Sequence, residues 1–168
     1  MKKLTRFQQN LFKTLHLISA SIWLTGVITL ALMPFISVNI KSGDELYMYN
    51  LVYHFIDIKI LSPAAISTLI TGLIFSIFAN WGFFKHGWLI YKWVITVLII
   101  LAGTFYLGPM VITMLEIADI KRISALEDSY YQSGSSIGLW ASIVNTALLI
   151  IAVIVSVYKP WRNIKNEK

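Results

Sequence analysis

The chain has 168 residues, of which 57% are hydrophobic and 13% charged, and it carries a formal net charge of +6. A soluble domain has about a quarter charged residues, so this composition indicates an integral membrane protein forming one compact unit. The chain has no cysteine, which excludes disulfides, thiolate metal sites and cysteine nucleophiles. The basic residues lie at the ends of apolar runs, a pattern that favours contact with lipid headgroups and not with nucleic acid.

Four apolar runs are long enough to cross about 30 Å of hydrocarbon as helices. They cover about residues 11–36, 51–79, 88–115 and 137–158. The first run exceeds the core of a signal peptide, so we expect a retained span. Each run has a face of small or polar residues at helical spacing, and such faces pack inward in lipid. In the second run this face consists of Ala65, Thr68, Gly72 and Ser76. The sequence therefore predicts an all-α, up-down-up-down four-helix bundle in a single transmembrane domain, residues 1–168.

The predicted connections are Ser37–Asn50, Asn80–Gly87 and Glu116–Ser136. Of the 14 lysine and arginine residues, ten lie at the two termini and around the second connection, whereas the other side mixes four with most of the carboxylates. The positive-inside rule therefore places both termini in the cytoplasm. Three prolines are expected to bend or end helices near the outer surface: Pro34, Pro63 and Pro109.

His16 lies within the first apolar run, where a charged side chain costs about 2–3 kcal/mol or more, so it is a candidate functional residue. At 1.5 Å per residue, His16 lies roughly 7 Å along its helix from Leu11, and Lys92 roughly 6 Å from Trp88. Both runs start at the same face, so the two side chains are expected at similar depth. An imidazole and an ammonium facing one space could bind haem b, with the imidazole ligating iron. The ammonium would pair with a propionate or with a quinone carbonyl.

Two further residues join this predicted cofactor site. His86 lies at the same membrane face and is a candidate second ligand, and Trp23 lies two turns beyond His16. An alternative interpretation stays open, in which His16 is only hydrogen-bonded between helices and Lys92 extends to the interface.

A second cluster is predicted on the outer side, where imidazole and thioether groups could bind copper(I) or a second haem. The metal-ligand candidates of this cluster are His54, Met110 and Met114, and Met33 and Met48 fall on the same side. His16 is the metal-ligand candidate of the first site. Methionine is also an ordinary filler of apolar cores, and His54 suits an interface, so this alternative is open too. Asp57 is either a proton acceptor at the outer mouth or a solvated side chain.

Three stretches resemble a group of small bacterial membrane proteins. Leu15–Gly26 is similar to the "LH…W.G" first span shared by HemJ-type protoporphyrinogen oxidases, CopD-like copper-resistance proteins and the DUF2269 four-helix proteins. Ser62–Leu73 is similar to the HemJ-type "TPAM…GL" stretch, and Trp88–Trp93 looks like the lysine-bearing third span. The matching histidine and lysine are functional in the HemJ-type family, which binds a b-type haem, so the resemblance implies roles for His16 and Lys92.

The chain also departs from the HemJ-type pattern, because Leu32–Ser37 stands where that family has an arginine-containing segment, and no "NE.P" element is visible. The resemblance implies a protein of the bacterial inner membrane. We therefore expect a protein that binds a b-type haem or porphyrin and transfers electrons, with a quinone as partner. Whether it is a haem-dependent oxidoreductase stays open. The alternatives are copper handling at the outer face and a cofactor-free accessory subunit, in a homo-oligomer or a larger membrane complex.

Overall fold

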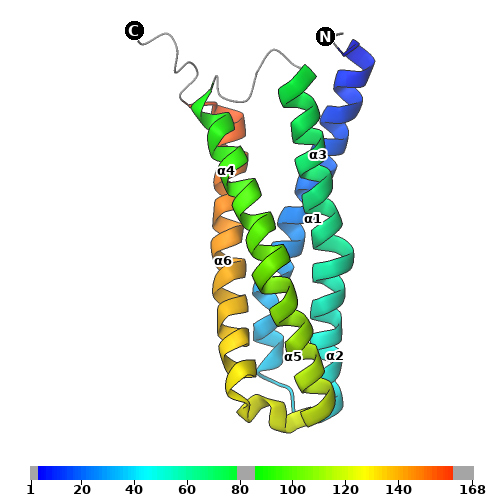
Figure 1. The fold of residues 1–168 in the computed structure, drawn as a ribbon, viewed down its shortest axis with the longest axis vertical. Coiled ribbons are helices and arrows are strands. Elements are labelled where there is room, and N and C mark those ends of the chain that lie inside the picture. Colours follow the sequence, from blue (N-terminus) through cyan, green and yellow to red (C-terminus); the bar gives the residue numbers. More distant parts are fainter. Residues whose placement is uncertain (1–3, 79–85, 161–168) are drawn as a thin grey trace.

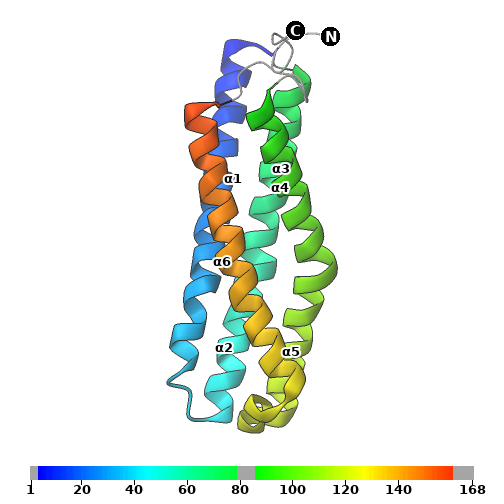
Figure 2. The same ribbon diagram turned by 90° about the vertical axis from the view of Figure 1, so that its left-hand side faces the viewer.

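The computed structural model describes residues 4–78 and 86–160, and within these ranges the chain forms four antiparallel helical columns and no strand (Figures 1 and 2). This confirms the predicted all-α bundle. We call the end where the first helix begins and the last one ends the terminal end, and the opposite one the distal end. The helical elements are α1 Arg6–Ser37, α2 Gly43–Phe55, η1 Ile56–Leu61, α3 Ser62–Phe78, α4 Gly87–Ala102, η2 Gly103–Leu107, α5 Gly108–Lys121, η3 Arg122–Glu127 and α6 Ser129–Tyr158.

Each column is long and apolar enough to cross a membrane. The four candidate spans are Arg6–Ser37, Gly43–Phe78, Gly87–Glu127 and Ser129–Tyr158. The second and third columns each join two α-helices through a short π-helical segment, so α2, η1 and α3 run as one rod, and α4, η2 and α5 as another.

At the distal end the helices extend beyond the predicted spans, and two predicted connections are wrong in extent. Helix α2 begins at Gly43, so most of Ser37–Asn50 is helical, and Glu116–Ser136 contains the end of α5, the 3₁₀ turn η3 and the start of α6. Apolar run length locates only the hydrocarbon-compatible part of a helix. The polar first turn of α2 is held instead by a capping box, in which the Ser42 hydroxyl accepts from the Glu45 N–H and the Glu45 carboxylate accepts from the Ser42 N–H.

The prolines act as local breaks in long helices, not as their ends. Pro63 and Pro109 each follow a π-helical segment, in which the N–H of Ser62 donates to the Asp57 carbonyl and the N–H of Gly108 to the Gly103 carbonyl. A proline has no N–H and its ring clashes with the carbonyl four residues back, so the wider turn accommodates it. Pro34 lies within α1, which continues to Ser37.

The columns are held by buried apolar clusters at different levels. The central one joins all four columns and consists of Trp23, Val27, Ala64, Ala65, Ile99 and Leu149. A distal cluster contains Leu46, Met110, Met114, Ala118, Ala125 and Tyr131. The buried Asn50 side chain crosses the distal cluster and donates to the Tyr131 hydroxyl at 2.8 Å. Helix α1 packs along α3 and α6, whereas α4 makes fewer contacts with its neighbours.

Asp128 fixes the start of α6, and its replacement gives a pH-dependent prediction. Its carboxylate accepts from the N–H groups of Tyr130 and Tyr131 at 2.9 and 3.0 Å and pairs with the Lys121 ammonium at 2.6 Å. The Lys121 ammonium and these N–H groups hold the pKa of Asp128 below its ordinary value. A carboxyl with a lowered folded-state pKa stabilises the fold above its unfolded pKa of about 4, and this is lost as pH falls through the folded-state value.

We therefore expect Asp128→Ala to lower the melting temperature of detergent-purified protein at pH 7, measured by circular dichroism. The difference from wild type should shrink below about pH 4, as the wild-type carboxyl takes up its proton. A difference that stays constant down to the lowest pH would contradict a role for the Asp128 charge.

Candidate functional site

The terminal half of the bundle contains a partly open cavity of about 790 Å³ between α1, α3, α4 and α6. This volume falls within the roughly 300–1,000 Å³ typical of small-molecule and cofactor sites. The cavity extends from Gln9 and Lys159 near the terminal end down to Trp23 and Leu149 of the central cluster. Helix α4 packs less closely against its neighbours than α1 packs against α3 and α6, and the space lies between α4 and these helices.

His16 lines this cavity from α1 and is held in place by α3. Its Nδ1 lies 2.8 Å from the Thr71 hydroxyl. That hydroxyl has one proton, and its oxygen lies 2.7 Å from the Ser67 carbonyl and 3.1 Å from the Thr68 carbonyl, so it donates to the backbone. In the tautomer that suits this arrangement, Nδ1 donates to the Thr71 oxygen and the lone pair lies on Nε2. An imidazole fixed in this way is the form that ligates a metal.

Neighbouring residues of α3 complete the seat of the imidazole. Phe75 packs edge-on against it, with ring centroids 6.2 Å apart. Gly72 lies beside the imidazole Cε1, and a Cβ at this glycine would stand 3.8 Å from it. The ring therefore has contacts on two sides while it lines the cavity. Sequence reasoning missed Thr71, because the small-residue face predicted for this helix ran through Thr68 and Gly72 instead.

Lys92 lines the same cavity from α4, as the depth comparison predicted. Its ammonium lies 5.9 Å from the ring centroid of Trp88, which suits a cation–π contact. Lys13 and Lys159 also line the cavity, and the described lining residues include no aspartate or glutamate. The cavity is therefore apolar and aromatic with cationic groups, a combination that suits a planar or elongated ligand carrying carboxylates.

The other two predicted cofactor residues occupy different places. Trp23 forms part of the cavity floor and is 1% exposed, and its Nε1 has no hydrogen-bond partner among the described residues. His86 precedes the first turn of α4, where its ring stacks on Trp88 at a centroid distance of 6.0 Å. His86 is not among the residues that line the cavity. The structure thus brings His16, Lys92 and Trp23 to one space and places His86 at its edge.

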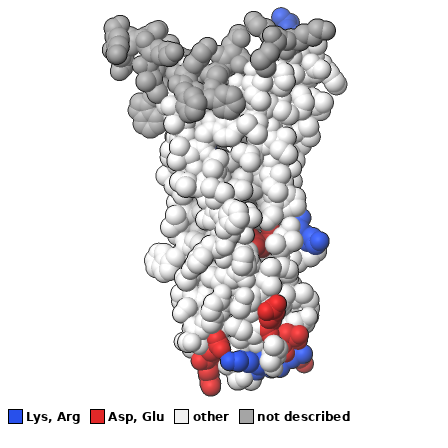
Figure 3. Space-filling model, in the orientation of Figure 1, with Lys and Arg blue, Asp and Glu red and all other residues white. Residues whose placement is uncertain are grey.

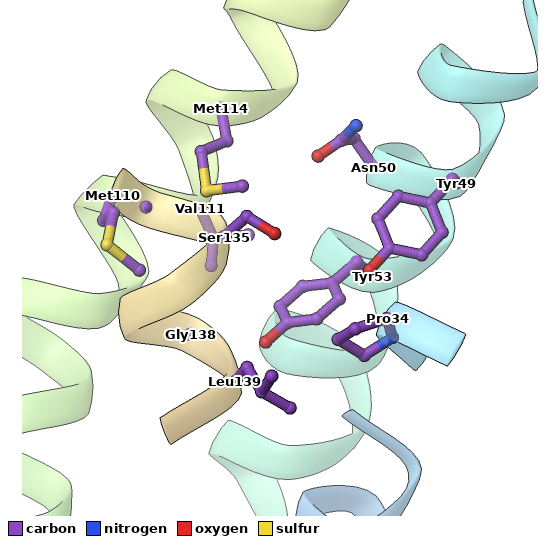
Figure 4. A pocket seen from close by; sticks show the side chains of 11 residues that line it. Pro34, Tyr49, Asn50, Tyr53, Met110, Val111, Met114, Ser135, Gly138 and Leu139 are labelled. Carbon is purple, nitrogen blue, oxygen red and sulfur yellow. The ribbon is translucent and has the colours of Figure 1, made fainter. Parts of the chain in front are cut away.

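The outer-side metal candidates do not all line one cavity. Met110 and Met114 line a much smaller cavity of about 20 Å³, together with Tyr49, Tyr53 and Asn50 (Figure 4). The Met114 sulfur lies 2.7 Å from the position that a Cβ on Gly134 would take, so this methionine fills the gap between α5 and α6. His54 does not line the small cavity, and its Nδ1 is buried without a hydrogen-bond partner among the described residues.

The two remaining outer-side methionines differ in exposure. Met33 is 7% exposed and Met48 is 51% exposed, so they have different surroundings. Among the described residues, no group of three or more histidine, aspartate or glutamate side chains is arranged to hold a metal ion. The distal half therefore offers two thioethers in one cavity and a separate imidazole.

Comparison with known proteins supports the membrane assignment. A family model described as a predicted integral membrane protein, DUF2269, matches residues 10–160. No curated protein matches the chain, and no solved structure matches it. The match covers all four helical columns and the cavity between them. The chain therefore belongs to the DUF2269 family and is a multi-pass integral membrane protein.

Proposed function

We propose that this protein binds a b-type haem or a related porphyrin in the terminal cavity and takes part in electron transfer. The observation that carries the proposal is His16, which lines a cavity of about 790 Å³ and whose Nδ1 lies 2.8 Å from the Thr71 hydroxyl, a contact that leaves the lone pair on Nε2 when Nδ1 is the donor. Bound haem would supply the one-electron chemistry, and its iron would take the imidazole as axial ligand. The residues present fit such a group in ligand type, size of space and charge.

The cations of the cavity support a ligand with carboxylates. Haem carries two propionates, and Lys92 lies at a depth where its ammonium would pair with one of them. Lys13 and Lys159 line the part of the cavity nearer the terminal end. The net positive lining therefore favours a porphyrin oriented with its propionates toward these lysines, and it disfavours a cation in the same space.

The setting of the cavity supports a lipid-soluble electron partner. The cavity lies among membrane-spanning helices, and the sequence has no nucleotide-binding motif. A quinone is therefore the partner that we propose. The lysine distribution supports a terminal end that faces the cytoplasm, and the resemblance to small bacterial proteins supports the bacterial inner membrane.

The direct test is the visible spectrum of protein purified from haem-replete cells, before and after reduction with dithionite. We expect the bands of a b-type haem at close to one haem per chain. Among the described residues, His16 is the one histidine that lines the cavity, so we also expect a shifted reduced spectrum after addition of carbon monoxide. A colourless preparation that takes up no added haem would overturn the proposal and favour a cofactor-free accessory subunit.

Copper handling has narrower support, from Met110 and Met114, whose side chains line one cavity. Metal analysis of the purified protein distinguishes the two proposals. Copper bound at the distal end would be lost in a double Met110→Leu/Met114→Leu variant, and haem bound at the terminal end would be retained.

A further inference from the structure

The helical columns are longer than a membrane is thick, so part of the bundle must stand outside the hydrocarbon. Gly43–Phe78 alone contains 36 residues in one rod, which at 1.5 Å per residue is about 54 Å. The hydrocarbon core of a bilayer is about 30 Å thick. Helices tilted by the usual 20° or so remove only a small part of this difference. Column length alone therefore does not determine which part of the bundle the hydrocarbon surrounds.

Three exposed side chains of interfacial type lie at a common level near mid-length. The central cluster sets the reference, because Ala65, Ile99 and Leu149 pack together there. Along each column toward the distal end, Lys59 lies about 9 Å from Ala65, Tyr106 about 10 Å from Ile99 and Trp140 about 14 Å from Leu149. Lys59 is exposed, Tyr106 is 58% exposed and Trp140 is 66% exposed. We call these three residues the mid-bundle ring.

The distance from the mid-bundle ring to the terminal end matches one hydrocarbon thickness. It is about 29 Å from Lys59 to Phe78, about 29 Å from Tyr106 to Gly87 and about 27 Å from Trp140 to Tyr158. Tyrosine and tryptophan are enriched at membrane–water interfaces, and lysine extends its ammonium to the headgroups. The ring therefore has the composition and the spacing of a membrane boundary.

Charged side chains are nearly absent on the terminal side of the ring, and on the distal side they are Asp57 and a group at the distal end, since the described residues 31–40, 106–115 and 129–140 carry none. Among the described residues, the stretches 14–30, 60–78, 87–105 and 141–158 contain Lys92, which lines the cavity, and no other lysine, arginine, aspartate or glutamate. On the distal side the rods carry many charged side chains, and Figure 3 shows charged groups gathered at the distal end, others at mid-height and a further blue group at the terminal end. The charged residues on the distal side are Lys41, Asp44, Glu45, Asp57, Glu116, Asp119, Lys121, Arg122, Glu127 and Asp128.

The backbone irregularities coincide with the ring as well. The two π-helical segments, Ile56–Leu61 and Gly103–Leu107, contain Lys59 and Tyr106. A carbonyl left without its usual N–H partner is costly in hydrocarbon, whereas water and headgroups satisfy it at an interface. Both proline breaks are therefore placed where their cost is smallest.

We infer that the hydrocarbon covers only the terminal part of the bundle, that Lys59, Tyr106 and Trp140 contact the headgroups of one leaflet, and that the bundle beyond them stands in water. The lipid partner of the ring is the headgroup layer, in which a phosphate accepts from the Lys59 ammonium. The distal core, with its Asn50–Tyr131 hydrogen bond, then belongs to an extramembrane extension about 20 Å tall. The terminal cavity stays within the membrane.

The absence of cysteine from the chain allows a direct test with single cysteines. Val52 and Ile66 lie on the same rod on opposite sides of the ring and are 43% and 50% exposed, so Val52→Cys and Ile66→Cys form a matched pair. Each variant is placed in lipid nanodiscs, which leave both faces open to a charged maleimide. We expect Val52→Cys to react readily. Ile66→Cys should react at least roughly tenfold more slowly, because a rise of one unit in thiol pKa already cuts the thiolate fraction by that factor.

Detergent denaturation must restore labelling of Ile66→Cys, which shows that its thiol is intact. Ile36→Cys gives a second measurement, since Ile36 is 63% exposed at the distal end of α1 and is expected to react as Val52→Cys does. Equal protection of Val52→Cys and Ile66→Cys would overturn the inference and centre the membrane on the whole bundle. Rapid labelling of Ile66→Cys would overturn it as well.

Discussion

Replacing His16 with alanine is expected to abolish haem binding while leaving the bundle folded. The side chain is only partly buried, and its one hydrogen bond to a described side chain is the contact with Thr71 at 2.8 Å. Its removal takes away the proposed axial ligand and enlarges an existing cavity, so folding should suffer little. The measurement is the reduced spectrum of the purified variant, together with titration of haem into the apoprotein and circular dichroism of the helices.

His54→Ala is the matched control for this prediction. It removes an imidazole from the same chain and the same membrane protein, but from a place that does not line the terminal cavity. We expect it to retain full haem content. Added imidazole should restore part of the spectrum in His16→Ala, since the ligand can enter the space that the side chain leaves. A His16→Ala variant with the spectrum and affinity of wild type would remove the main support for the proposed function.

Thr71→Val tests whether the contact with Thr71 orients His16 as an iron ligand or serves only to join α1 to α3. Valine keeps the shape of threonine and removes the oxygen that accepts from Nδ1 of His16. Loss of such an outer partner typically costs 10–100-fold in metal affinity, so we expect an intermediate haem affinity. If His16 served only to join α1 to α3, Thr71→Val and His16→Ala would lower thermal stability equally and neither would affect a bound chromophore.

The architecture could be predicted from the sequence because it follows from strong and simple signals. Apolar runs of sufficient length identified the four columns, and the shared starting face of the first and third runs placed His16 and Lys92 at one depth. Both lie on the cavity in the structure. The family resemblance to DUF2269 is confirmed by a match over residues 10–160. The four columns and the common depth of His16 and Lys92 follow from hydrophobicity and helical rise alone, and both can be read directly from the residue order.

The parts that were missed depend on contacts between distant segments. The extension of α2 to Gly43 had a usable signal, the Ser42–Glu45 capping box, but the apolar-run criterion overlooked it. The partnership of Thr71 with His16 joins residues on different helices, and its register depends on how α1 and α3 pack. The sequence also could not show that His54 does not line the cavity of Met110 and Met114, because residues on one side of a membrane need not share one face of a bundle.

Lys92→Gln is expected to weaken haem binding without loss of the haem ligand. Lys92 is the one charged side chain in the described stretches 14–30, 60–78, 87–105 and 141–158. A charged hydrogen bond from it to a propionate would contribute about 1.5–3 kcal/mol. Removing it should therefore lower haem affinity by roughly ten- to hundredfold, with each 1.4 kcal/mol giving a factor of ten. The measurement is haem titration into the apoprotein, compared with wild type under the same detergent and salt.

Two controls and a second readout separate binding from packing. Lys92→Arg keeps the charge and should retain most of the affinity, whereas Lys13→Gln, at a more exposed position on the same cavity, should have a smaller effect because water screens its charge. A positive charge near the iron favours the reduced haem, which carries one positive charge less, so Lys92→Gln should also lower the midpoint potential. If Lys92 only extended toward the interface over Trp88, affinity and potential would both stay at their wild-type values, because the cation–π contact alone does not reach the ligand.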